Sequence, residues 1–546
     1  MSKLTKLLVT LLFVLFISCK SEESKKDLKV FRYNETSGIS SLDPAYANTP
    51  PNIWAVNQLY NGLVELDKNF NIVPSLSESY NVSKDGLVYT FKLKKKVYFH
   101  DNEVFDNGEG REINAHDFVY SFKRICSDTT ASTGKWIFYG KVKMNKLGGV
   151  ASDAFTALDD NTLQIKLNAP FPPFIKLLTM PYAFVVPKEA VKKYGKDFRN
   201  HPVGTGPFYF KTWDESSLLI MLKNKNYWKV DEEGKKLPYL DAINISFIGD
   251  ENMAFINFEQ KKLDFLSGIN ENSRDMILDH KGNVKKEFSS KFKIHRLLYL
   301  NTEYLGFQLD TSTYTDKNHP LLNKKVRQAL NYSVNREEMI DYMRNGLGVP
   351  GISGFVPYPL LFKHKIKGYN YNPSKAIELL GEAGYKNKKL NLTLYTTAPY
   401  KQISEYLQKT WSKIGINLTI EINQASTHRD LANKGQLPFF RASWVGDYMD
   451  IENYTSVFLS TSKAPAGPNK SRFSNSKYDN LYEQALVEQD SDRREDLYME
   501  MDQILMEEAP ILVLYYDELL RLTHNNIHGL DANPMNMLFL EKVKKD

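Results

Sequence analysis

Cysteine is almost absent, since the 546 residues contain only Cys19 and Cys126. Cys19 belongs to the leader described below, so Cys126 has no partner for an intramolecular disulfide, and the fold must rely on its hydrophobic core. We expect Cys126 to act as a small buried hydrophobic residue. The same shortage excludes a zinc site built from several thiolates.

Long apolar runs and an excess of one charge are also lacking. After the first twenty residues, no stretch approaches the length of a membrane span. The 71 basic and 65 acidic residues leave a formal charge of +6, which is too thinly spread for a nucleic-acid footprint. The sequence therefore predicts neither a multi-span membrane protein nor a nucleic-acid partner.

Catalytic motifs are equally scarce. The ten histidines are scattered, and the one pair at i, i+4 spacing, His524 and His528, lacks the glutamate of a zinc-protease helix. Ser460 to Lys463 matches Ser-x-x-Lys, but the partner motifs of penicillin-recognising enzymes and the Gly-x-Ser-x-Gly elbow do not occur. We therefore expect a protein that is not an enzyme and that uses no cofactor and no metal.

The N-terminus has the pattern of a bacterial lipoprotein export signal. Lys3 and Lys6 precede an apolar run over residues 7–17, which is too short to span a bilayer, and Ser18 precedes Cys19. We expect cleavage before Cys19, acylation of Cys19 and a flexible polar tether after it. An ordinary signal peptide or a short anchor is the alternative, and Phe16 stands where lipoproteins usually carry leucine.

The rest of the chain is too long for one compact core and predicts two or three domains of α/β class. Alternating apolar residues over 390–394, helical spacing over 403–414 and alternation again over 416–422 predict a strand-helix-strand unit with parallel strands. Residues 439–445 would add a strand to that sheet. Further strands are expected at 29–33, 87–93, 208–210 and 511–516, and helices at 53–60, 115–124, 326–334, 373–385 and 497–506.

The segment from Arg441 to Tyr448 concentrates polar chemistry at the end of a predicted strand, where open α/β sheets bind ligands. Odd positions of an extended segment share one face, so Arg441 and Asp447 could flank one groove. A zwitterion would fit, with its ammonium at Asp447 and its carboxylate at Arg441. An internal ion pair at the strand end explains the same residues equally well.

Nine short motifs in one order give the chain a resemblance to a known family. They are Ser41-Leu42-Asp43-Pro44, Gly62-Leu63-Val64, Tyr89 to Leu93, Ala115 to Ser121, Gly204 to Phe208, Asn226-Tyr227-Trp228, Val326 to Leu330, Tyr371-Asn372-Pro373 with Glu382 to Tyr385, and Trp444-x-x-Asp447-Tyr448. With these motifs the chain resembles the oligopeptide-binding lipoproteins of bacterial ABC importers, which are family 5 solute-binding proteins.

The resemblance implies a two-lobed α/β architecture, the periplasmic-binding-protein type 2 fold, which closes about a hinge and has one lobe split into two subdomains. The implied division is a signal peptide over 1–18, a tether over 19–28, the main part of lobe 1 over 29–61, 187–299 and 513–546, an extra subdomain of lobe 1 over 62–186, and lobe 2 over 300–512.

The resemblance also implies roles at the strand end. Asp447 would bind the N-terminal ammonium of a peptide, with Trp444 beside it, and the main chain of Ser443 and Val445 would pair with the peptide like a strand. Arg441 would meet a carboxylate end. Tyr448 completes the motif.

Several positions depart from the family pattern on the opposite wall. Asn48 replaces a peptide-facing acidic residue, and Pro50 has no N–H for a strand partner. Gly134 stands where peptide binders carry tyrosine, with Trp136 close by as a substitute wall, and Ser426 replaces a pocket aromatic.

The sequence thus predicts a lipid-anchored monomer outside the cytoplasmic membrane, on the periplasmic side of a Gram-negative envelope or exposed at the surface. It would capture oligopeptides and deliver them to an ABC permease. Open alternatives are another ligand on the same fold, namely a dipeptide, a nickel chelate, haem or a sugar oligomer, and a surface interaction lipoprotein without transport.

Overall fold

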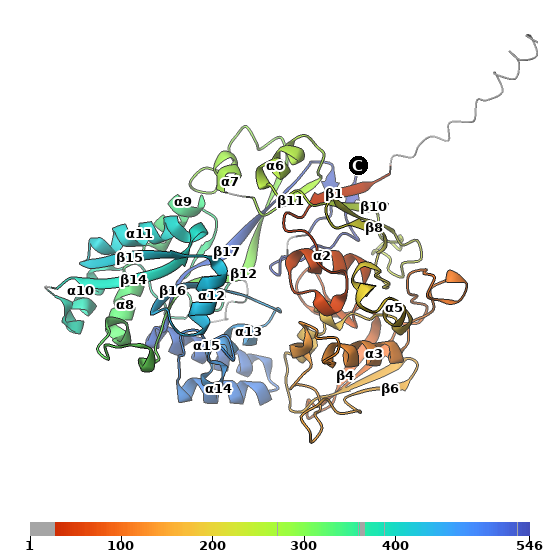
Figure 1. Ribbon diagram of the computed structural model, residues 1–546, viewed down its shortest axis with the longest axis horizontal. Helices are drawn as coiled ribbons and strands as arrows, with labels where there is room; N and C mark the ends of the chain where they lie inside the picture. The colour runs from red at the N-terminus through yellow and green to blue at the C-terminus, as the bar shows by residue number, and fades with distance from the viewer. Residues whose placement is uncertain (1–27, 270, 359, 361–365, 387, 532) are drawn as a thin grey trace, which may run out of the picture.

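The computed structural model of the protein describes residues 28–269, 271–358, 360, 366–386, 388–531 and 533–546 (Figure 1). The predicted signal peptide, Cys19 and all but the last residue of the predicted tether lie outside these residues. Two α/β lobes stand side by side in Figure 1, which confirms the predicted two-lobed fold class. The domain boundaries given above stay a prediction.

One continuous sheet runs through both lobes. Its strands, in spatial order, are β15 (Ile416–Asn423), β14 (Leu390–Thr397), β16 (Phe439–Val445), β12 (Lys293–Phe307), β17 (Ile511–Thr523), β11 (Phe265–Ser267), β1 (Val30–Asn34), β10 (Ala242–Ser246), β9 (Leu218–Lys223) and β8 (Phe208–Asp214). The short strand β13 (Val349–Pro350) pairs with β17 beside this path. The order of the strands shows that β12 and β17 connect the two lobes.

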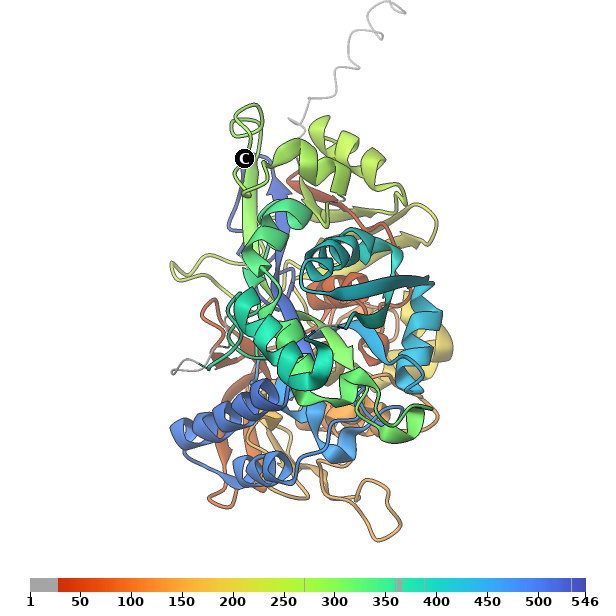
Figure 2. The ribbon, with the colours of Figure 1, turned by 90° about the vertical axis from the view of Figure 1, so that its left-hand side faces the viewer.

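These two connecting strands form the hinge region. The second half of β12 pairs with the first half of β17 in lobe 2, and their other halves pair next to β11 in lobe 1 (Figure 2). Their register is interrupted between Leu298 and Thr302. The predicted strand 511–516 is therefore only the first half of β17, which continues through Asp517 and Glu518 because β12 supplies a partner there.

The strand-helix-strand unit is confirmed. Strands β14 and β15 are parallel and in register over their whole length, with α11 (Lys401–Ser412) between them in the chain. Trp411 of α11 is fully buried, and its Nε1 donates to Ser333 Oγ at 2.7 Å. The helix thus packs its apolar stripe on one face of the sheet, as the spacing predicts.

The extra subdomain has its own antiparallel sheet, in the order β4 (Ser77–Val82), β5 (Val88–Leu93), β7 (Thr162–Lys166) and β6 (Phe155–Asp159). Helix α3 (Ala115–Cys126) packs on this sheet and starts with a capping box formed by Asn114 and Asp117. Strands β2 (Val64–Leu66) and β3 (Ile72–Pro74) and helix α4 (Phe174–Leu177) also lie here, and α5 (Lys188–Tyr194) follows in the main part of lobe 1.

Four of the remaining helices, over residues 50–59, 324–332, 373–380 and 491–508, overlap helices predicted from the sequence, and the others have no predicted counterpart. Lobe 1 has α2 (Pro50–Leu59), α6 (Glu251–Glu259) and α7 (Glu271–Ile277); lobe 2 has α8 (Lys324–Tyr332), α9 (Arg336–Arg344), α10 (Pro373–Leu380), α12 (Ala425–Asn433), α13 (Glu452–Thr455), α14 (Ser476–Val487) and α15 (Ser491–Glu508). Strands β18 (Ile527–His528) and β19 (Lys544–Lys545) pair near the C-terminus. None of the helices in the described ranges combines the length and the apolar character of a membrane span.

Pro50 is the first residue of α2, so its missing N–H lies at a helix start and not at the strand edge that we expected. The first N–H groups of a helix have no partner within the helix, and proline at this position is therefore tolerated. The departure at Pro50 is explained by helix initiation rather than by a lost strand pairing.

Candidate functional site

Strand β16 ends in a tight turn that positions Asp447. The Gly446 N–H donates to the carbonyl of Leu300 at 2.7 Å, and a Cβ atom at position 446 would lie only 2.7 Å from the Tyr454 hydroxyl. A side chain at position 446 would collide with this hydroxyl, and because β16 ends at Val445, Asp447 lies just beyond the sheet. This turn lies at the carboxyl end of the strand, where open α/β sheets bind ligands.

One edge of β16 is open beyond its first residues. Strand β12 pairs with β16 from Phe439 to Val445, whereas on the other side β14 meets it only at Phe440. The Gly446 N–H bonds to Leu300 of β12, so the N–H groups of even-numbered residues in β16 point toward β12. On the opposite side, His428 Nε2 donates to the Arg441 carbonyl at 2.8 Å. Main-chain groups alternate along a strand, so those of Ser443 and Val445 face the open side.

Asp447 is an accessible carboxylate without a countercharge. Its side chain is exposed, yet it forms no ion pair with any described residue, and the surrounding protein raises its pKa by desolvation. A hydrogen bond from the Asn453 side chain opposes this rise. A carboxylate that is partly dehydrated and unpaired is well placed to gain from a ligand cation.

Trp444 is held next to this carboxylate through α13. Its Nε1 donates to the Asn453 carbonyl at 3.0 Å and lies 3.3 Å from Asn453 Oδ1. The same Oδ1 accepts the Asp447 N–H at 3.0 Å. The indole and the carboxylate are thus fixed by one buried asparagine, which the sequence did not indicate.

Arg441 forms an internal ion pair, but its partner is not Asp447. Its guanidinium makes a two-point contact with Glu303 of β12, with Nη2 to Oε2 at 2.5 Å and Nε to Oε2 at 3.0 Å. The ring of Tyr400 lies 3.4 Å below it. Because Glu303 is only 2% exposed, the pair belongs to the interior of lobe 2. A contact of Arg441 with a ligand carboxylate stays a prediction.

Residues of the extra subdomain of lobe 1 contact the segment that follows Asp447. Trp136 packs on Tyr448 with ring centroids 6.3 Å apart, and Lys176 Nζ forms an ion pair with Asp450 Oδ2 at 2.8 Å. Tyr448 is only 5% exposed and belongs to the same hydrophobic cluster as the core of lobe 1. The segment that begins at Asp447 therefore touches both lobes, and Trp136 contacts it at Tyr448. A role of Trp136 as a wall of the ligand site stays a prediction.

The ring of Tyr182 lies against Gly134, the position where the family pattern has a tyrosine. A Cβ atom on Gly134 would lie 2.2 Å from the Tyr182 ring, so no side chain fits there. Tyr182 is close enough to Asp447 for that carboxylate to contribute to the raised pKa of its hydroxyl. No local motif marks Tyr182, because it comes from a different part of the chain. Asn48 and Ser426 are both exposed.

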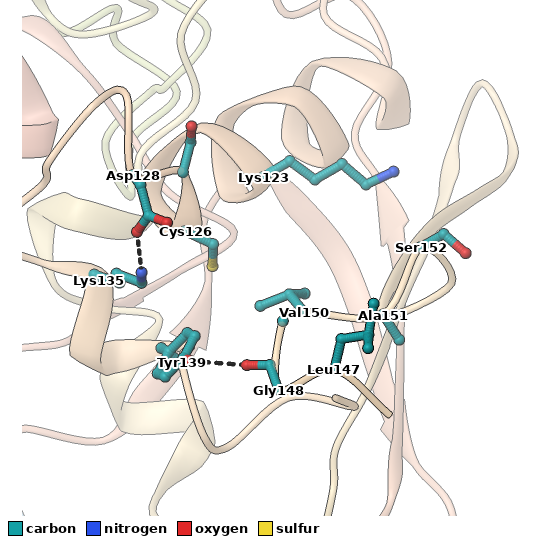
Figure 3. A pocket seen from close by; sticks show the side chains of 12 residues that line it. Lys123, Cys126, Asp128, Lys135, Tyr139, Leu147, Gly148, Val150, Ala151 and Ser152 are labelled. Carbon is teal, nitrogen blue, oxygen red and sulfur yellow. Dashed lines mark hydrogen bonds and ion pairs between the residues drawn. The ribbon is translucent and has the colours of Figure 1, made fainter. Parts of the chain in front are cut away.

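A surface pocket of about 610 Å³ lies elsewhere on the extra subdomain (Figure 3). Cys126 borders it, together with Lys135 and Tyr139. Burial raises the pKa of the Cys126 thiol to about 12, which leaves the thiol protonated and unreactive. None of the predicted site residues lines this pocket.

The fold is that of a two-lobed α/β protein, and the candidate site lies at the end of β16, next to residues of the other lobe. The chain matches the model of the "Bacterial extracellular solute-binding proteins, family 5 Middle" over residues 71–466. It therefore belongs to the family 5 extracellular solute-binding proteins.

Similar proteins have different ligands in their names. Heme-binding protein A of Haemophilus influenzae is 30% identical, over 83% of this chain and 80% of that relative. The dipeptide-binding protein of Escherichia coli is 27% identical, over 89% and 88%. A periplasmic binding protein of Helicobacter pylori, solved in complex with the peptide STSA, has a TM-score of 0.73 at 25% identity and covers 94% of this chain and 98% of its own.

Proposed function

We propose that the protein captures oligopeptides by their N-terminal ammonium group outside the cytoplasm and delivers them to an ABC permease. The observation that carries this proposal is Asp447, an accessible carboxylate without a countercharge among the described residues, beside an open strand edge. The ammonium would pair with Asp447, and the peptide main chain would pair with Ser443 and Val445. The peptide-bound relative from Helicobacter pylori supports this ligand class.

Main-chain pairing accounts for binding without strong selection of side chains. Every peptide has the same N–H and C=O groups, so the open edge of β16 can accept many sequences. The Trp444 indole adds an apolar surface beside the ammonium position. We expect tri- to pentapeptides of different sequence to bind with similar affinity.

Replacing Asp447 tests the proposal directly. We expect Asp447→Ala to abolish peptide binding in calorimetry and Asp447→Asn, which keeps the shape, to weaken it about a hundredfold or more, because a charge-assisted bond and its partner are lost. N-acetylated peptides should fail to bind the unchanged protein. Asp160→Asn, at an exposed carboxylate on the extra subdomain, is the matched control. Undiminished affinity of Asp447→Ala would refute the assigned role.

The proposal includes capture without turnover and an anchor made of lipid. Peptides that co-purify with the protein should be intact by native mass spectrometry, whereas cleaved products would indicate an enzyme. Cys19→Ala should release the protein from the membrane fraction, because the lipid would have no attachment point. The same mass spectra identify the class of the bound ligand. If the co-purified ligand is a dipeptide, haem, a nickel chelate or a sugar oligomer, the proposed oligopeptide ligand is wrong.

A further inference from the structure

Asn453 connects two residues of the candidate site, Trp444 and Asp447. It lies in the short helix α13 and is only 4% exposed. Its Oδ1 accepts the Asp447 N–H at 3.0 Å and lies 3.3 Å from Trp444 Nε1, and its main-chain carbonyl accepts from the same indole at 3.0 Å. One side chain thus orients the indole and the start of the turn together.

The side-chain amide of Asn453 also acts on the carboxylate. With Oδ1 used by the main chain, its N–H groups remain as donors, and they hold the pKa of the Asp447 side chain down against the effect of desolvation. An amide can donate and accept at once, which a carboxylate cannot, and its reach is longer than that of serine. Asparagine therefore suits a position that must hold an N–H and a carboxylate of the same residue.

We propose that Asn453 is the positioning residue of the ligand site, which fixes the Asp447 carboxylate and the Trp444 indole in the orientation that receives the ligand ammonium. This inference rests on the proposed function. It extends that function to a residue six positions beyond Asp447, on a different element from the residues that would touch the ligand.

Among the groups around Asp447, Asn453 is the one that favours the charged form of the Asp447 carboxyl. The titratable groups that face the carboxylate are Tyr182 of the extra subdomain, Tyr299 of β12 and Tyr454 of α13. Burial raises the pKa of each of these hydroxyls, so all three are neutral near pH 7. Loss of the Asn453 amide would leave desolvation unopposed.

Asn453→Ala in the full-length protein tests the inference. Without ligand, we expect the pKa of Asp447 to rise, as followed by carboxylate ¹³C NMR with Asp447→Asn to assign the signal. With a tripeptide, we expect about tenfold weaker binding at pH 7 and an acid limb of the affinity profile that moves to higher pH. Asn480→Ala, at an exposed position of α14, is the matched control and should change neither readout.

A purely structural role makes a different prediction. It lowers the melting temperature but leaves the titration of Asp447 and the acid limb where they are, and that result would overturn the inference. If Asn453→Ala does not fold, Asn453→Ser, which also lacks the amide, gives the same test. If Asp447→Ala abolishes peptide binding while Asn453→Ala leaves the pKa of Asp447 unchanged, this inference fails and the proposed function stands. If the unchanged protein binds no peptide, the proposed function fails, and the NMR titration of Asp447 still tests the role of Asn453.

Discussion

At the scale of single residues, the pKa of Asp447 links its environment to a measurable property. Desolvation raises this pKa above the usual aspartate range, so the carboxylate becomes protonated at a higher pH than a solvated one. Only the ionised form can pair with an ammonium group. The affinity for a peptide must therefore depend on the protonation of this one side chain.

We expect peptide affinity to follow a bell-shaped pH profile. It should fall as the pH decreases through the raised pKa of Asp447, and it should fall again above about pH 8, where the peptide amine loses its proton. Calorimetry from pH 4 to 9 measures both limbs. In Asp447→Asn the acid limb should vanish, and an unchanged acid limb in that variant would assign the titration to another group.

A second residue controls stability rather than binding. Asp502 of α15 is fully buried and accepts the N–H groups of Phe355 and Val356, with the shortest contact at 2.8 Å. Burial raises its pKa to about 7, and the two backbone hydrogen bonds only partly oppose this. A folded-state pKa above the unfolded one means that the folded protein binds the proton more tightly.

We therefore expect the free energy of unfolding to decrease as the pH rises from about 4 to about 7 because of Asp502, with the loss complete above that range. Each pKa unit between the folded and unfolded values corresponds to about 1.4 kcal/mol. Asp502→Asn keeps an acceptor for both N–H groups and should be more stable than the unchanged protein at pH 8. Denaturant unfolding at several pH values checks this, and a variant as pH-dependent as the parent would contradict it.

At the scale of elements, the segment after β16 couples the two lobes. Asp447 is the proposed ligand contact, while Tyr448 and Asp450 contact Trp136 and Lys176 of the extra subdomain. On the same subdomain, Phe70 packs against the core of lobe 2. A ligand that fixes the position of Asp447 would thus also stabilise the contacts of Tyr448 and Asp450 with the other lobe.

Removing the Trp136 ring should weaken this contact. An aromatic pair contributes about 1 kcal/mol beyond its buried area, so we expect Trp136→Ala to raise the peptide Kd about fivefold without moving the acid limb of the pH profile. Lys176→Ala should have a smaller effect, because its ion pair is partly exposed. Tyr139→Ala, at an exposed ring of the same subdomain, serves as the control in the calorimetry. No change of Kd in Trp136→Ala would exclude a role of this contact in binding.

At the scale of the whole molecule, local patterns predicted the elements better than the contacts between them. The alternation at 390–394 and 416–422 and the helical spacing around Trp411 were sufficient for the parallel unit, because each pattern lies within a few residues. The second half of β17 does not follow from the sequence, since Asp517 and Glu518 interrupt the apolar pattern and the strand continues there because it pairs with β12.

The site divides in the same way. Asp447 and Trp444 lie in one motif at a strand end and could be predicted from the sequence. Tyr182 and Asn453 could not, because the fold alone brings them to Asp447. The pairing of Arg441 with Glu303 was also hidden, since the two residues are far apart in the chain and meet only across β12 and β16.

The most direct test is a crystal structure of the protein with a bound tripeptide. We predict the peptide ammonium within hydrogen-bonding distance of the Asp447 carboxylate, with main-chain bonds from the peptide to Ser443 and Val445. A structure in which that carboxylate is turned into an ion pair with the protein, and the peptide lies elsewhere, would contradict the account.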